Sequence, residues 1–150
     1  MKHSLPLRAL SRLLQYPDLE LMEHLPEVAA ALYEMPKLSK KVHLGLMEFV
    51  NNLEASDLMD SQENYVECFD RGRATSLHLF EHVHGDSRER GQAMVDLLQT
   101  YKEGGLQLSA NELPDHLSII LEFASTLPLD QAKQFVGEMA HILNAVYSTL

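Results

Sequence analysis

The sequence has very little cysteine, with Cys68 as its only thiol. One cysteine forms no disulfide within the chain and supplies neither a CxxC zinc site nor a cysteine-ligated cluster. Stability must therefore come from a hydrophobic core, for which 45% apolar residues in a chain of 150 are sufficient. No linker, internal repeat or low-complexity tract divides the chain, so we expect residues 1–150 to form a single domain.

Long hydrophobic runs are also missing. The first residues, MKHSLPLRALSRLL, lack the continuous apolar region and small-residue cleavage site of a secretory signal. No other run is long enough to span a bilayer. A cytoplasmic protein without direct membrane insertion is the simplest interpretation.

Basic residues are scarce, with 12 Lys and Arg against 22 Asp and Glu, and the formal net charge is -10. An acidic surface disfavours nucleic acid and anionic membranes as main partners because both carry negative charge. The charge suits a partner segment that carries Lys or Arg. The alternative is that it serves only solubility.

Strand signals are nearly absent, since the sequence shows no sustained period-2 alternation and no Asn-Gly or Asp-Gly hairpin turn. Apolar stripes with helical spacing recur instead, which predicts an all-α, single-domain helical bundle. Three such stripes lie in residues 7–14, 21–32 and 42–53. Tyr16-Pro17 stops the first stripe, Asp18 is a candidate cap for the second, and Pro26 should kink or split that second helix.

Further along the chain, two acidic pairs have capping-box spacing. Asp60 with Glu63, and Asp86 with Glu89, are predicted to open the next two helices. The second of these helices should end at Gly104-Gly105, which favours a helix C-cap.

Two more helices are predicted near the C-terminus. The first covers residues 113–127, with Pro114 in its first turn and Pro128 at its end, and its wide apolar face predicts burial on two sides. The last helix is expected over residues 132–150. Its apolar pattern has not finished where the chain ends, so we expect a truncated form of a longer protein.

Residues 65–91 form the least ordinary stretch. They hold three of the eight histidines and four of the twelve basic residues: His78, His82, His84, Arg71, Arg73, Arg88 and Arg90. A metal-dependent hydrolase using His78, His82 and Glu81 is one alternative, but HExxH and an evident third ligand are missing. Ser76 and Ser87 lie near histidines without a GxSxG signature. We therefore expect neither a catalytic residue nor a metal site.

A binding site fits the same stretch better. The chain carries more apolar side chains than one modest domain must hide, with charged groups close by in sequence. An apolar groove edged by such groups accepts an amphipathic peptide helix. His116 should lie at a helix N-terminus, where a cation is unfavourable, so we expect a neutral hydrogen-bonding ring or a partner for Asp115.

These residues also carry a family resemblance. The blocks FDRGRATSL and LFEHVHG, with LPDHL further on, resemble the signature of the NarJ family of nitrate reductase delta-subunit chaperones. The matching residues are 11–14, 16–18, 69–77, 79–85, 87–88, 90–94 and 113–117. The match therefore spans most of the chain.

The resemblance implies a fold and a function. NarJ belongs to a wider all-helical group with the TorD and DmsD chaperones. Its members are not enzymes. In the cytoplasm they bind the N-terminal segment of a molybdoenzyme's catalytic subunit and assist insertion of the molybdenum cofactor before membrane docking. For this chain it implies the apo nitrate reductase catalytic subunit as partner, no cofactor of its own, and molybdenum cofactor biosynthesis proteins as further candidate partners.

The resemblance also implies site residues. A peptide-binding role carries over to Pro114, Asp115 and His116. The other expected peptide-binding residues are Tyr65, Phe69, Leu77, Phe80, His82 and Leu117. Arg71 and Arg73 are candidates for ordering the loop or for holding an anion. In the alternative function, a direct carrier of the molybdenum pterin dinucleotide, these two arginines would bind its phosphates.

Overall fold

The protein is built from α-helices. The computed structural model describes residues 4–35, 38–85 and 87–150, and over these residues the expected all-α fold is confirmed, with an isolated bridge between His78 and His116 as its one piece of β-pairing. The helices are α1 (Leu5–Leu13), α2 (Leu19–Tyr33), α3 (Lys40–Ala55), α4 (Leu58–Phe69), α5 (Phe80–His84), α6 (Arg88–Glu103), α7 (Leu117–Ser125), α8 (Leu129–Gly137) and α9 (Ala140–Thr149). Within these described parts, no helix has both the length and the apolarity needed to cross a bilayer.

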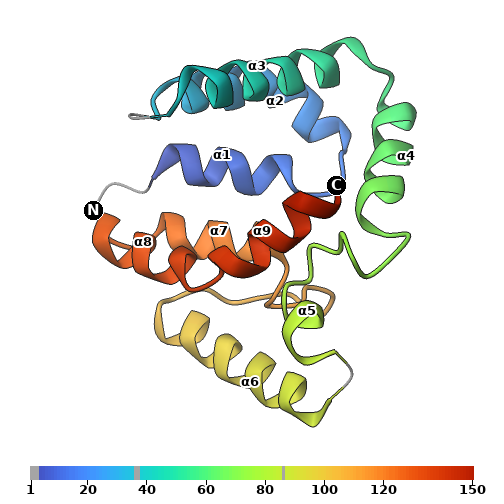
Figure 1. Cartoon of the computed structure of the whole chain (residues 1–150). Coiled ribbons are helices and arrows are strands. Elements are labelled where there is room, and N and C mark those ends of the chain that lie inside the picture. Colours follow the sequence, from blue (N-terminus) through green and yellow to red (C-terminus); the bar gives the residue numbers. More distant parts are fainter. Residues whose placement is uncertain (1–3, 36–37, 86) are drawn as a thin grey trace.

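The helices lie in successive layers (Figure 1). The pair α2 and α3 is uppermost, α1 lies beneath it, and α7, α8 and α9 come next, followed by α5 and α6 at the opposite end. Helix α4 stands across one side of this stack. Helix α1 packs against both α2 and α7, so it joins the upper and lower halves.

Helix α7 is central, as its wide apolar face predicted. Leu117, Ile120 and Leu121 belong to one buried cluster, which includes Leu79 and residues of α9. Ile119 and Phe123 belong to another, with residues of α6. A third buried cluster lies between α1, α2 and α3. The expected burial of α7 on two sides is therefore confirmed.

Several predicted helix ends are confirmed. The Asp18 carboxylate accepts a hydrogen bond from the N–H of Leu21 at 2.8 Å and so caps α2. Gly104 is the C-cap of α6, and Gly105 follows with φ of 91°. That left-handed conformation is one that glycine adopts without strain.

Two helix starts differ from the prediction. Helix α4 begins at Leu58 after Asp57, so Asp60 lies within its first turn and is not its cap. Asp60 there still complements the positive end of the helix dipole. Helix α6 begins after Ser87 and has Glu89 in its first turn, while Asp86 lies outside the described residues.

Three further differences concern proline and glycine. Of the two alternatives for Pro26, splitting of the helix is wrong, because the buried Leu21, Leu25, Val28 and Leu32 hold one continuous face of α2. Pro114 is not in the first turn of α7, which begins at Leu117, because the preceding residues pair with another segment. The prediction of one helix over residues 132–150 is wrong, since α8 ends at Gly137 and α9 begins at Ala140. This break lets Ala132 of α8 and Ile142 of α9 both be buried, and glycine disfavours a continuous helix there.

Candidate functional site

Two segments distant in sequence cross near the middle of the molecule. Leu77 and His78 run antiparallel to His116 and Leu117, with the bridge between His78 and His116. The N–H of Leu117 donates to the carbonyl of Leu77 at 2.9 Å, and the N–H of Leu79 donates to the carbonyl of Asp115 at 3.1 Å. The histidine-rich block and the Pro114-Asp115-His116 stretch are therefore one structural unit.

The Asp115 side chain is completely buried in this unit. Its Oδ2 accepts a hydrogen bond from the N–H of Phe80 at 3.1 Å, and its Oδ1 lies 3.4 Å from Nδ1 of His78. Tyr101 donates its hydroxyl to the carbonyl of Pro114 at 2.7 Å. A buried carboxylate is tolerated when it is paired and hydrogen-bonded in this way.

His116 connects this unit to helices α1 and α4. Its Nδ1 accepts from the N–H of Ser118 at 3.2 Å, which caps α7 and places the proton of a neutral ring on Nε2. Nε2 lies 3.4 Å from the hydroxyl of Tyr65, and that hydroxyl donates to the carbonyl of Leu14 at 2.7 Å. Hydrogen bonds therefore run from α7 through α4 to the end of α1.

The two histidines have opposite pKa shifts although their ring centroids lie 4.9 Å apart. The hydrogen bond to Asp115 raises the pKa of His78. Burial, with the neighbouring His78 as the second cause, lowers the pKa of His116 to about 4. His116 is therefore neutral at physiological pH, as its position before a helix predicted. The partner of Asp115 is His78 and not His116.

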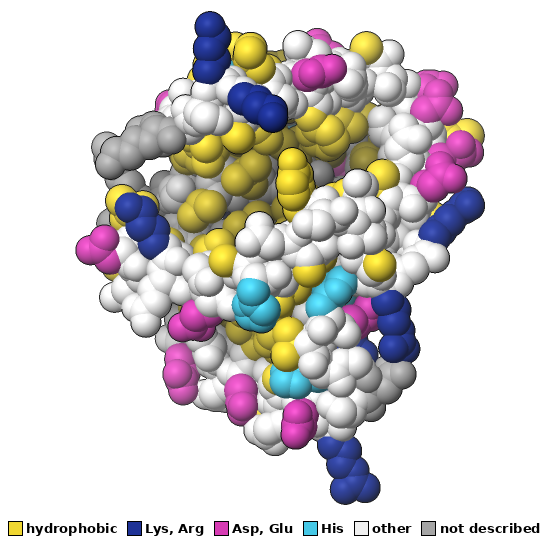
Figure 2. All heavy atoms as spheres, viewed as in Figure 1, with side chains coloured by type: hydrophobic (Ala, Val, Ile, Leu, Met, Phe, Trp, Pro, Cys, Tyr) yellow, Lys and Arg dark blue, Asp and Glu magenta, His cyan; other side chains and the backbone are white. Residues whose placement is uncertain are grey.

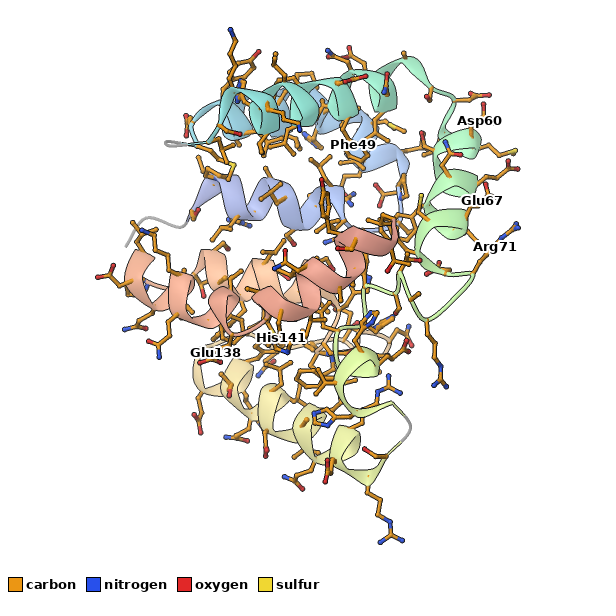
Figure 3. The ribbon with its side chains drawn as sticks, in the orientation of Figure 1. Phe49, Asp60, Glu67, Arg71, Glu138 and His141 are labelled. Carbon is orange, nitrogen blue, oxygen red and sulfur yellow. The ribbon has the colours of Figure 1, made fainter. Side chains whose placement is uncertain are left out.

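An apolar groove lies beside this unit, between α1, α3 and α4. It encloses a cavity of about 250 Å³, and we define it by Leu13, Leu14, Phe49, Leu53, Tyr65 and Phe69. Figure 2 shows hydrophobic side chains gathered in a hollow beneath α3. In Figure 3, Phe49 lies on the lower side of α3, facing this hollow, whereas Asp60, Glu67 and Arg71 point outward from α4. Cys68 and Asn64 also line the groove.

A second cavity of about 590 Å³ lies on another side of Tyr65. It is lined by two tyrosine rings, two carboxylates and the two neighbouring histidines: Tyr16, Tyr65, Asp70, Glu112, His78 and His116. Tyr65 thus contributes to both cavities. Burial raises the pKa of Tyr65 to about 12, so its hydroxyl stays protonated and able to donate.

The structure brings some of the predicted peptide-binding residues together and separates others. Tyr65 and Phe69 line the apolar groove, and His116 lines the second cavity. Pro114 and Asp115 are buried, and Asp115 contacts His78 of that cavity. Leu77 and Leu117 are buried in the core. A peptide-binding role for any of them stays a prediction.

The remaining predicted residues lie away from the groove. Phe80 packs against the cluster around Tyr101. Nε2 of His82 lies 2.8 Å from the carbonyl of Ser76. Glu81 pairs with Arg90 at 3.5 Å. The described residues contain no group of three His, Cys, Asp or Glu side chains arranged to hold a metal ion.

The two candidate anion-binding arginines are exposed. Arg71 lies 3.9 Å from Glu67, which belongs to the preceding turn of α4. Arg71 and Arg73 line a third cavity that also contains Asp70 and Glu81. Its mixed charge is less suited to phosphate than a purely basic site would be.

Sequence reasoning missed most residues of these cavities, among them Leu13, Tyr16, Phe49 and Leu53. Phe49 and Leu53 belonged to an apolar stripe, which alone does not distinguish core from groove. The exposed fraction distinguishes a groove residue from a core residue, since 46% of the aromatic Phe49 is accessible to solvent. Such exposure follows from the packing of α3 against α2 and could not be read from spacing.

Comparison with known proteins now gives the family. A family model described as nitrate reductase delta subunit matches residues 19–148. The chain is 50% identical over 133 residues to the nitrate reductase molybdenum cofactor assembly chaperone NarJ of Escherichia coli, an alignment covering 89% of this chain and 56% of that protein. It is 48% identical over 139 residues to the probable chaperone NarW of the same species, covering 91% and 56%.

A more distant relative matches as well, and one solved structure has a similar fold. The probable NarJ of Bacillus subtilis is 33% identical over 125 residues, which cover 83% of this chain and 67% of that protein. A candidate redox enzyme maturation protein of Archaeoglobus fulgidus shares the fold, with a TM-score of 0.63 at 23% identity over 95% of this chain and 84% of that one. The chain spans just over half the length of the two Escherichia coli relatives. The family model and these relatives together show that the chain belongs to the nitrate reductase delta subunit family, as its central residue block indicated.

Proposed function

We propose that this chain is a non-catalytic assembly chaperone of the cytoplasm. It binds the N-terminal segment of the nitrate reductase catalytic subunit, hereafter the client segment, and so assists insertion of the molybdenum cofactor before membrane docking. The family and the names of its relatives support the general role. The observation that carries the proposal for the client segment is the open apolar groove between α1, α3 and α4.

The groove has the chemistry that an amphipathic helix needs. Leucine and aromatic side chains line it. Phe49 at its edge is 46% exposed, although an aromatic residue is normally more buried. Burying exposed apolar surface drives association, and aromatic residues at the centre of an interface contribute most. The chain as a whole carries a formal net charge of -10, which favours a segment with basic residues.

A synthetic client peptide carrying one tryptophan tests the proposal. The chain has no tryptophan, so all indole emission comes from the peptide and shifts when its ring leaves water. We expect saturable binding by the wild-type chain. Phe49→Asp should weaken it by at least about tenfold, because the change places a charge against an apolar helix face.

Leu98→Asp on α6 is the matched control. Leu98 is 44% exposed, close to the 46% of Phe49, but it lies outside the apolar groove. Both variants should keep the helical circular dichroism and unfolding midpoint of the wild type, since neither residue is buried. Equal affinity of Phe49→Asp and wild type would refute this groove as the client site, and no binding by the wild type would refute the proposed function.

The alternative role as a cofactor carrier has less support. It needs Arg71 and Arg73 to face phosphate groups, yet Asp70 and Glu81 share their cavity. Carboxylates beside a phosphate site repel the ligand. The geometry favours a protein segment over a nucleotide-like cofactor.

A further inference from the structure

We propose that the second cavity receives a Lys or Arg side chain of the client segment while apolar side chains of the same segment occupy the neighbouring apolar groove. This inference rests on the proposed function and adds what the segment must carry. It assigns recognition to Tyr16, Tyr65, Asp70 and Glu112.

The cavity has the charge that a cation requires. Asp70 and Glu112 contribute carboxylates, and none of the described residues that line it is Lys or Arg. Glu112 is held in place because its Oε1 accepts the N–H of Ser109 at 3.1 Å. Within the described structure the Asp70 carboxylate makes no hydrogen bond or ion pair, and the nearby Arg71 instead approaches Glu67 at 3.9 Å.

The histidines at the base do not cancel this negative charge. His116 is neutral, since burial lowers its pKa to about 4. His78 is protonated more readily than an ordinary histidine, but that charge faces the buried Asp115 carboxylate at 3.4 Å. The pair is close to neutral as a unit, so Asp70 and Glu112 determine the sign of the cavity.

Aromatic walls add a second element of cation recognition. The rings of Tyr16 and Tyr65 meet edge to face with centroids 5.8 Å apart. Tyr16 is 50% exposed, so a ring with a large apolar face is available to a ligand. Lysine and especially arginine bind over such faces, and a carboxylate beside the ring strengthens the contact.

The position of Tyr65 links the two cavities. Its ring lines both, and its hydroxyl is occupied by the carbonyl of Leu14 at 2.7 Å, so the ring cannot swing away without breaking that bond. A segment lying along α1 and α4 can therefore place apolar side chains in one cavity and a basic side chain in the other. An acidic or phosphorylated segment would be repelled.

Peptide analogues test this directly. In the synthetic client peptide each Arg is replaced in turn by citrulline and each Lys by norleucine, which removes charge while keeping most of the shape. For the wild-type chain we expect one analogue to bind about three- to tenfold more weakly than the parent peptide. In Asp70→Asn/Glu112→Gln, the parent and that analogue should bind equally, and in wild type their difference should shrink at high salt.

Asp130→Asn/Glu138→Gln is the control, because it makes the same change in net charge at exposed residues that do not line the cavity. It should preserve the discrimination between parent and analogue. If Asp70→Asn/Glu112→Gln also preserves it, or if wild type binds every analogue as tightly as the parent, the inference is overturned while the proposed function stands. If wild type binds no peptide, both fall.

Discussion

At the scale of single residues, His116 has two roles that depend on one protonation state. Its Nδ1 caps α7 by accepting from Ser118, and its Nε2 faces the Tyr65 hydroxyl at 3.4 Å. A proton on Nδ1 would remove the acceptor and place a cation at the positive end of a helix. The neutral ring is therefore part of the folded structure.

This gives a pH dependence with a definite sign. The pKa of His116 falls from 6.5 to about 4 on folding, so between these values the unfolded chain binds more protons. Acidification from pH 7 to 4.5 should therefore destabilise the protein, with His116 contributing on the order of 2 kcal/mol. His78 has a raised pKa, so its contribution is present at low pH and is lost as pH rises through that raised value.

The variant His116→Asn separates the contribution of His116 to the pH dependence of stability from that of His78. Asparagine caps helices well and does not titrate, so α7 keeps an acceptor for Ser118. We expect the free energy of unfolding of this variant, from urea titrations, to fall less between pH 7 and 4.5 than that of wild type. Parallel pH profiles would contradict a neutral His116 in the folded state.

The sequence predicted the neutral ring of His116 but not the partner of Asp115. A histidine before an apolar helix predicts a neutral ring because the helix dipole is a local effect. The partner of Asp115 is His78, which lies 37 positions away in sequence. Such long-range pairings depend on how loops cross, and helical periodicity says nothing about them.

At the scale of elements, the end of α6 shows a close contact that depends on glycine. A Cβ built on Gly104 would lie 2.5 Å from Cε1 of Phe123, a buried ring that also packs against Tyr101 and Phe135. The absence of a side chain at Gly104 thus lets α6 end directly against α7. Gly91, in the same helix, has no neighbour within 4 Å of such an added atom.

Alanine at these two positions should have opposite effects. Gly104→Ala is expected to lower the free energy of unfolding by about 1–3 kcal/mol through overpacking. Gly91→Ala should raise it by about 0.5–1 kcal/mol, because alanine favours an exposed helix interior. Urea denaturation followed by circular dichroism measures both. A stabilised Gly104→Ala would mean that Phe123 has room to move.

Apolar spacing and capping residues predicted the helices and several of their ends, but not the interruption between α8 and α9. Local signals such as Asp18 and Gly104-Gly105 marked ends correctly because caps act through neighbouring backbone groups. The break after Gly137 separates α8 from α9, although the apolar stripe continues across it. Gly137 disfavours a continuous helix there, and the break lets Ala132 and Ile142 both be buried, which is a tertiary property that spacing does not report.

At the scale of the whole molecule, α7 should make unfolding cooperative. Ile120 is completely buried in one cluster, while Phe123 on the same helix belongs to another. Ile120→Ala should cost about 2–5 kcal/mol, and far-UV and near-UV circular dichroism should still report one coincident transition. Leu129→Ala, at a residue 67% exposed, should change little. Two separate transitions in the Ile120 variant would contradict a shared core.

At this scale the fold class and family could be predicted, whereas the position of the groove and most of its lining residues could not. An apolar stripe says which residues avoid water, but leaves open whether a helix or a partner covers them. Leu13 and Phe49 come from helices whose juxtaposition is a tertiary property. Of the residues expected at the site, Tyr65 and Phe69 line the apolar groove, while Leu77 and Leu117 lie in the core.

The position of Cys68 has a practical consequence. It is the sole thiol of the chain, it is exposed, and it stands at the wall of the apolar groove. A maleimide dye or nitroxide would therefore attach at one known place without any engineered cysteine. Its emission or mobility would follow, in real time, what enters and leaves beside it.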